Sequence, residues 1–219
     1  MSDDQHLYKI IVIGDYAVGK TCIIKRYCEG LFTPHYKLTI GVDFAVKVVD
    51  WDDHTRISLQ LWDVAGHERF GTMTRVYYKY AIAAVIVFDV SRPATFDAVL
   101  KWREDINSKV VLANNEPIPC ILLANKCDLP NTTIDEAALD EFVKKHNFIL
   151  WKATSAQDDV GINEAMKELI AEILKVSKEN APNRKDTGIK LDKGGAKETK
   201  PGAAQNPGSN EQNQSTCCA

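Results

Sequence analysis

The sequence predicts an α/β domain on a doubly wound, mostly parallel sheet, followed by a disordered tail. Three observations predict it. Short apolar runs of strand length alternate with helical patterns through residue 178. A glycine-containing loop directly follows the first apolar run, and polar motifs follow two later ones. From Ala181 onward, Lys, Gly, Pro, Asn, Gln and Ser dominate and apolar residues almost disappear.

Six strands are expected, over residues 7–13, 42–49, 56–62, 82–88, 118–124 and 148–151. The second and third surround the polar turn at 50–54 and form a hairpin, which makes one strand of the six antiparallel. Helices are expected over 21–30, 95–111, 135–146 and 162–176. The last carries an apolar stripe at helical spacing, made of Ile162, Ala165, Met166, Leu169, Ile170, Ile173 and Leu174. Such helices flank the sheet on both faces.

Size and composition fit one domain at 7–178, a flexible N-terminus at 1–6 and a tail at 179–219. The net charge is −3, and no nucleic-acid partner is expected. No apolar run reaches 18 residues, and the first six residues lack a basic-then-apolar signal, so a cytosolic origin is expected. The six cysteines are scattered without zinc spacing, which argues against a disulfide framework.

The loop after the first strand reads GDYAVGKT at 14–21 and fits the phosphate-loop pattern GxxxxGK[ST]. Its glycines let backbone N–H groups surround a phosphate, Lys20 adds a positive charge, and the Thr21 hydroxyl can bind Mg²⁺. This predicts a P-loop NTPase. The motif alone leaves the type of nucleotide open.

Two downstream motifs narrow the choice. DVAG at 63–66 places Asp63 at a strand end, where it can hold Mg²⁺ through water, and its Gly66 N–H can meet a terminal phosphate oxygen. NKCD at 125–128 follows another strand, and the Asp128 carboxylate can accept from guanine N1–H and N2–H₂. Adenine offers no such pair of donors. Three motifs in this order, each after a strand, predict binding of GTP and GDP with Mg²⁺.

With these motifs in place, the chain resembles a Ras-superfamily small GTPase, and more narrowly a Rab, over residues 7–178. The Rab-like segments are IGVDF at 40–44, LWD at 61–63, ERF at 68–70 and the tandem Tyr77-Tyr78. FAVKV at 44–48, MTRVYY at 73–78 and LANKCD at 123–128 are similar to the Rab subgroup of lysosome-related organelles.

The resemblance implies a role for particular residues. Those expected to contact the nucleotide are Tyr16, Ala17, Val18, Gly19, Lys20, Thr21, Cys22, Phe32, Tyr36, Thr39, Gly66, Asn125, Lys126, Asp128, Ser155, Ala156 and Gln157. Mg²⁺ would be held by Thr21, Thr39 and Asp63, and catalysis would involve Lys20, Thr39, Gly66 and His67. Thr39 and Gly66 lose a partner when the γ-phosphate leaves, so two loops would change their order. Phe44, Trp62 and Tyr77 would form the partner-binding surface.

The chain departs from the family pattern at four positions. His67 stands where most relatives carry the Gln that orients the attacking water, which predicts very slow intrinsic hydrolysis; a solvated residue without a catalytic part is the alternative. Tyr16 and Ala17 replace a small residue and Gly, and Tyr16 is expected near the γ-phosphate, where it would crowd an incoming arginine. Gln157 replaces a Lys, but guanine selection should persist through the Ala156 N–H.

The C-terminus ends in Cys217, Cys218 and Ala219. A C-a-a-X signal needs Cys where Thr216 stands, whereas paired terminal cysteines resemble Rab double geranylgeranylation. Two lipid chains anchor stably where one is marginal. The tail's basic residues exceed its acidic ones only slightly, too few for electrostatic membrane binding.

The sequence therefore predicts a monomeric, membrane-anchored GTP/GDP switch that hydrolyses GTP and recruits effectors for vesicle trafficking and the biogenesis of lysosome-related organelles. It would cycle between cytosol and the cytoplasmic face of endosomal, lysosomal or lysosome-related membranes. Its expected partners are an exchange factor, a GTPase-activating protein, effectors, Rab escort protein and GDP dissociation inhibitor. The alternative is a GTP-bound membrane scaffold with little or no hydrolysis, motivated by His67 and Tyr16.

Overall fold

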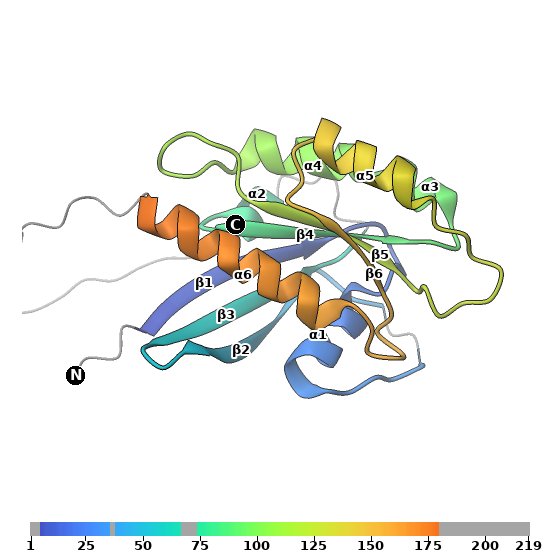
Figure 1. The fold of residues 1–219 in the computed structure, drawn as a ribbon, viewed down its shortest axis with the longest axis horizontal. Coiled ribbons are helices and arrows are strands. Elements are labelled where there is room, and N and C mark those ends of the chain that lie inside the picture. Colours follow the sequence, from blue (N-terminus) through green and yellow to red (C-terminus); the bar gives the residue numbers. More distant parts are fainter. Residues whose placement is uncertain (1–4, 36–37, 67–73, 180–219) are drawn as a thin grey trace, which may run out of the picture. The chain divides into compact units, whose positions relative to one another are not determined.

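The computed structural model describes residues 5–35, 38–66 and 74–179. Several predicted functional positions lie outside these ranges, namely Tyr36, His67, Cys217 and Cys218. Within them, the chain folds around one six-stranded sheet with the strand order β2-β3-β1-β4-β5-β6 (Figure 1). β2 is antiparallel to β3, and every other neighbouring pair is parallel. The predicted sheet, with one antiparallel strand in six, is confirmed.

The strands alternate with helices along the chain. The strands are β1 (Gln5–Ile13), β2 (Val42–Asp52), β3 (Thr55–Val64), β4 (Ala83–Asp89), β5 (Cys120–Asn125) and β6 (Trp151–Thr154). The helices are α1 (Lys20–Glu29), α2 (Thr74–Tyr78), α3 (Pro93–Asp97), α4 (Val99–Lys109), α5 (Glu136–Lys145) and α6 (Ile162–Glu179). Because all strands but β2 run the same way, their carboxyl ends meet at one edge of the sheet.

Three elements differ from the sequence prediction. The helix expected over 95–111 is divided, because the N–H of Ala98 bonds to the carbonyl of Phe96 instead of one four residues back. β6 lies three residues later than expected, because the Phe148 N–H caps α5 through the carbonyl of Val143. The short helix α2 was not predicted at all, although Tyr78 at its end is fully buried.

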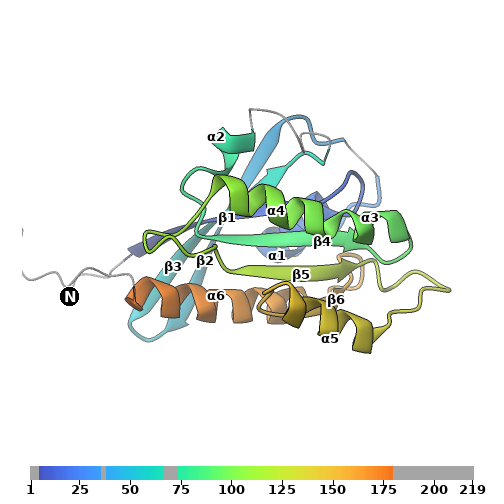
Figure 2. The same cartoon turned by 90° about the horizontal axis from the view of Figure 1, so that it is seen from above.

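Two apolar cores lie on the two faces of the sheet, and alternate residues of each strand point into one or the other. On β5, Ile121 and Leu123 join the core under α1 and α6, whereas Leu122 and Ala124 join the core under α2, α4 and α5. Figure 1 shows α1 and α6 crossing the near face of the sheet, and Figure 2 shows α3 and α4 running beside β4. Strands buried on both faces explain the continuous apolar runs in the sequence.

The apolar stripe predicted on the last helix is confirmed in α6. Its members Ile162, Ala165, Met166, Leu169, Ile170 and Ile173 are all buried, with Leu174 packed at the margin. Each large side chain buried in this way contributes on the order of 1.5–3 kcal/mol. The stripe therefore fixes α6 against β5 and β6.

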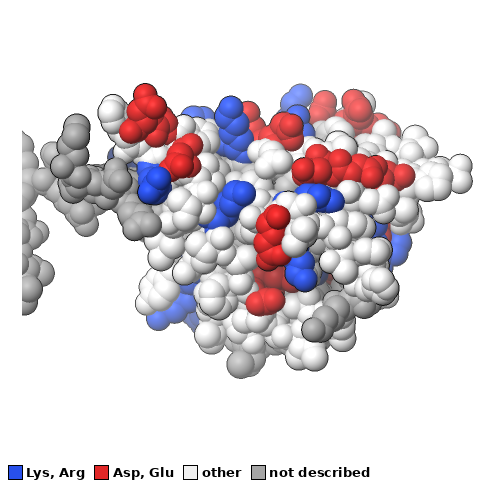
Figure 3. All heavy atoms as spheres, turned by 90° about the horizontal axis from the view of Figure 1, so that it is seen from below, with Lys and Arg blue, Asp and Glu red and all other residues white. Residues whose placement is uncertain are grey.

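The described cysteines are unpaired, and the charges on the surface are mixed in sign. The four cysteines that the structure describes, Cys22, Cys28, Cys120 and Cys127, are free thiols, as expected. Figure 3 shows acidic and basic side chains scattered among uncharged ones over one face of the molecule. Among the described residues, no helix has both the length and the apolar character needed to cross a membrane.

Candidate nucleotide-binding site

The loop between β1 and α1 is held in a shape that its glycines permit. Gly19 precedes α1 with a φ of 101°, a conformation that other residues rarely adopt. A Cβ at Gly19 would lie 2.3 Å from Nδ2 of Asn125. The pattern GxxxxGK thus reflects both backbone conformation and the close approach of a second loop.

Lys20 begins α1 and folds back over the loop that precedes it. Its Nζ donates to the carbonyls of Gly14 and Asp15, both at 2.9 Å, and the side chain is buried. Burial lowers the pKa of Lys20 to about 8, although the carboxylates of Asp63 and Asp15 act in the opposite direction. The ammonium group is therefore placed in the loop, ready to meet an anion.

Three oxygen-bearing side chains from separate segments meet beside this lysine. The Thr21 hydroxyl lies 2.9 Å from that of Thr39 and donates to Oδ2 of Asp63, which also accepts from Thr39 at 3.2 Å. The other carboxylate oxygen, Oδ1 of Asp63, is buried without a protein partner. Burial raises the pKa of Asp63, while the two hydroxyls and the Lys20 charge act to lower it. Hydroxyl and carboxylate oxygens with an unsatisfied acceptor are a donor set that fits Mg²⁺.

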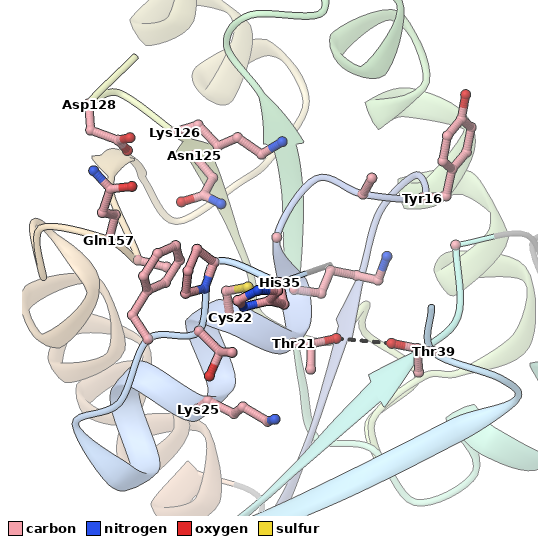
Figure 4. A pocket seen from close by; sticks show the side chains of 18 of the residues that line it. Tyr16, Thr21, Cys22, Lys25, His35, Thr39, Asn125, Lys126, Asp128 and Gln157 are labelled. Carbon is pink, nitrogen blue, oxygen red and sulfur yellow. Dashed lines mark hydrogen bonds between the residues drawn. The ribbon is translucent and has the colours of Figure 1, made fainter. Parts of the chain in front are cut away.

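At the other end of the site, NKCD follows β5 and joins the phosphate loop. Nδ2 of Asn125 donates to the carbonyl of Val18 at 2.8 Å, and its Oδ1 accepts from Thr154 at 3.2 Å. Nζ of Lys126 pairs with Asp89 at 2.7 Å. Asn125 is thus a buried connector between loops, and the carboxylate of Asp128 is left free to face the pocket (Figure 4).

These segments enclose one cavity of about 490 Å³. The expected nucleotide contacts that line it are Tyr16, Ala17, Gly19, Lys20, Thr21, Cys22, Phe32, Thr39, Gly66, Asn125, Lys126, Asp128, Ala156 and Gln157. Val18, Asp63 and Ser155 are buried beneath its surface instead, where the Ser155 hydroxyl accepts from the N–H of Asp158. Thr33, Pro34, His35 and Leu38 also line it and belong to the segment 32–39, which the family resemblance identifies as the first switch. Lys25 and Leu129 line it too, but they belong to no motif, so no signal in the chain pointed to them.

The two unusual positions of the phosphate loop take different arrangements. Ala17 adopts a φ of 57°, which suits the Gly common at this position. Tyr16 lines the cavity, but its ring points away from Thr21 and Thr39 (Figure 4). It lies instead 5.4 Å from the Arg92 guanidinium. Gly66 approaches the same stretch so closely that a Cβ there would lie 2.3 Å from the backbone nitrogen of Tyr16.

Residues at the start of α3 and on α4 also donate hydrogen bonds to the phosphate loop. The sequence did not indicate these contacts. Arg92 donates to the Tyr16 carbonyl at 2.8 Å and to Asp89 at 3.0 Å, and the Trp102 indole donates to Asp15 at 2.9 Å. Burial alone would raise the pKa of Asp89, but bonds from Lys126 and Ser91 overcome this and lower it. The anionic Asp89 therefore joins Lys126 at one end of the site to Arg92 at the other.

The predicted partner surface is partly assembled. Phe44 on β2 pairs in register with Trp62 on β3, and their rings stack with centroids 6.0 Å apart. Lys9 lies over the Trp62 ring at 3.5 Å. Tyr77 packs on the same face of the sheet, at the edge of the core that also contacts Trp62. Phe44 is 61% exposed, which is unusual for a large aromatic side chain.

Three features together define a small P-loop GTPase. They are the doubly wound sheet, the phosphate loop with its lysine, and the NKCD motif that contacts this loop at the carboxyl edge of the sheet. Comparison with known proteins agrees. The model of the Ras family matches residues 9–175. Ras-related protein Rab-32B of Dictyostelium discoideum is 68% identical over 179 residues, which is 82% of this chain and 69% of the relative.

This chain matches a larger share of two human relatives. Ras-related protein Rab-32 is 53% identical over 86% of this chain and 84% of the relative, and Ras-related protein Rab-7L1 is 48% identical over 82% and 89%. The chain belongs to the Ras family, and within it to the Rab GTPases. It binds guanine nucleotides, hydrolyses GTP and acts as a switch in vesicle trafficking in association with endomembranes.

The lowered pKa of Lys20 predicts a pH dependence of nucleotide binding. Below about pH 8 the lysine is charged in both the free and the bound protein, so affinity for GDP should be nearly constant. Above it the free protein loses the proton that binding must restore, so the affinity should fall, approaching about tenfold per pH unit. Titration of the dissociation constant from about pH 6 to about pH 9 measures this.

Guanine N1–H also titrates in the upper part of that range. The same titration of Lys20→Met keeps the guanine contribution and removes that of the lysine, so the difference between the two curves reports Lys20. Parallel curves for the two proteins would show that Lys20 stays charged throughout.

The conformation of Ala17 predicts that Ala17→Gly stabilises the protein. A left-handed backbone is strained for alanine and free of strain for glycine, so the free energy of unfolding should rise by about 0.5–1 kcal/mol. The same change at Ala171, in the middle of α6, should lower it by about 1 kcal/mol. Denaturant unfolding at saturating GDP compares both, and two losses of similar size would contradict the strain at Ala17.

Proposed function

We propose that the cavity holds GTP with its phosphates at the β1–α1 loop and its base at the NKCD motif, so that γ-phosphate contacts set the state of the switch. The observation that carries this is the meeting of Thr21, Thr39 and Asp63 oxygens beside the buried Lys20 ammonium. Thr39 comes from the segment between α1 and β2 and Gly66 from the one after β3. Losing the terminal phosphate would therefore release two segments at once.

Within this proposal, several groups of the chain would contact the phosphates. Lys20 would leave the carbonyls of Gly14 and Asp15 to meet the phosphates. Gly66 lies against the backbone of Asp15 and Tyr16, and its N–H would meet the terminal phosphate. Val18, Ala17 and Cys22 contribute backbone at the loop and the start of α1. The role given to Tyr36 lies outside the described residues.

Thr21, Thr39 and Asp63 would hold Mg²⁺, with Asp63 acting through water. When bound, the ion would neutralise phosphate charge as a Lewis acid. The buried, unpartnered Oδ1 of Asp63 supports this assignment, because such an oxygen is costly without a cation or water. Replacing Thr39 should then weaken the γ-phosphate-bound state more than the GDP state.

At the base end, we propose that Asp128 accepts from guanine and that the Ala156 N–H meets the guanine oxygen. Asp128, Lys126, Phe32 and Gln157 all line this part of the cavity. Asn125 acts through the phosphate loop, since both ends of its amide are used by protein groups. Ser155 likewise shapes the turn that carries Ala156.

Hydrolysis is proposed to be slow because His67 replaces the glutamine that orients water. We expect His67→Gln to raise single-turnover GTP cleavage by about tenfold without changing GDP affinity. Cleavage in the unchanged protein as fast as in His67→Gln would refute this role. Adding a Rab-activating protein to both tests the alternative, because a GTP-bound scaffold would leave GTP intact in its presence.

Phe44, Trp62 and Tyr77 are proposed to form the surface that effectors read. The rings of Phe44 and Trp62 stack on β2 and β3, and Tyr77 is on α2. These elements adjoin in the chain the two segments proposed to sense the γ-phosphate. An exchange factor, a GTPase-activating protein and effectors follow from the Rab switch in general. Rab escort protein and GDP dissociation inhibitor are proposed for delivering and extracting the lipidated chain, which works as a monomer.

We further propose that Cys217 and Cys218 carry two geranylgeranyl groups and that the chain serves endosomal, lysosomal or lysosome-related membranes. In cells, the double variant Cys217→Ser, Cys218→Ser should lose membrane association completely. Each single variant keeps one lipid chain and should bind only marginally. Fractionation and imaging of tagged chains distinguish these outcomes, and a membrane-bound double variant would show that another device anchors the protein.

A further inference from the structure

Arg26, in the last turn of α1, donates to three backbone carbonyls, one at the end of its own helix and two in a distant segment. Its Nε bonds to Ala156 at 2.8 Å, Nη2 to Gln157 at 2.9 Å and Nη1 to Gly30 at 2.7 Å. The first two acceptors lie about 130 residues further along the chain. All three guanidinium nitrogens are thus used by main-chain oxygens, and the side chain is half-buried.

These carbonyls lie in, or two residues before, the two segments that line opposite sides of the cavity. Gly30 ends α1 in a left-handed conformation, with a φ of 71° and its own N–H bonded to the Arg26 carbonyl. Two residues later, Phe32 lines the cavity on one side. Ala156 and Gln157 line it on the other, in the turn after β6. One side chain therefore ties together both sides of the base end.

The bonds also fix the direction of one particular N–H. The peptide that carries the Ala156 N–H has the carbonyl of Ser155, which accepts from Val160 at 3.0 Å. The next peptide has the carbonyl of Ala156, which accepts from Arg26. Because both neighbouring peptides are held, the Ala156 N–H has little freedom to turn. Preorganised donors discriminate between ligands better than mobile ones.

A guanidinium suits this task better than an ammonium. Its nitrogens form a planar, rigid fork that can bond several carbonyls at once, whereas a lysine is a single flexible charge. Arg26→Lys therefore keeps the charge and most of the stem while removing the simultaneous hold on two walls.

We propose that Arg26 is a positioning residue for base selection, which aims the Ala156 N–H at the oxygen on carbon 6 of guanine. This rests on the proposed placement of guanine in the cavity. Arg26 itself does not touch the nucleotide; it acts through the turn at 155–157 and through the end of α1.

The test compares GDP with 6-thio-GDP, which differs only in carrying a sulfur, a weaker acceptor, at the position in question. The unchanged full-length protein should bind GDP more tightly. In Arg26→Lys, affinity for GDP should fall by about tenfold and affinity for the thio analogue much less, so that the preference shrinks. Arg26→Gln, which keeps a shorter donor, serves as a second variant should the first fold poorly.

Arg56→Lys is the matched control, since Arg56 makes an exposed ion pair with Asp50 far from the cavity. It should leave both affinities and their ratio unchanged. An unchanged ratio of the two affinities in the Arg26 variants would overturn the proposal. If both affinities fall by the same factor, Arg26 stabilises the site in general and does not select the base. If the unchanged protein does not prefer GDP over the analogue, the placement of the base fails as well.

Discussion

The hydrogen bond from Asn125 to the carbonyl of Val18 is the constraint on which the site depends. It joins the loop after β1 to the last residue of β5, across 107 residues of the chain. The contact is so close that only glycine fits at position 19. Because both partners are buried, breaking it would leave polar groups unsatisfied. The spacing between the phosphate loop and the NKCD motif is therefore set by contacts within the protein.

Much of the fold could be predicted, and the failures have physical causes. Strands such as 118–124 are buried on both faces, so their apolar runs were unmistakable. The break at Ala98 depends on one backbone hydrogen bond and leaves no trace in composition. Phe148 reads as a strand residue because it is aromatic, but its N–H completes the last turn of α5. The short helix α2 has too few residues to show a period.

The site was predictable where chemistry requires a fixed residue type at a fixed spacing, as at Gly19, Lys20 and Asp63. It was not predictable where a side chain acts through main-chain oxygens, because a carbonyl can come from any residue. Arg26 and Arg92 are of this kind, because each donates to main-chain carbonyls of the site from a helix or its cap. Trp102 on α4 donates instead to the carboxylate of Asp15, 87 residues away, a contact that no local pattern marks. Tyr16 shows the same limit, since its carbonyl and its ring both contact Arg92, 76 residues away.

Strand β3 places Trp62 and Asp63 next to each other on opposite faces of the sheet. The tryptophan stacks with Phe44 on the outer side, and the carboxylate meets Thr21 and Thr39 on the inner side. In the proposed switch, a change in the ligand contacts of Asp63 would therefore reach the Trp62 surface across a single peptide unit. A shift of this strand by one residue would move both side chains to the opposite face of the sheet.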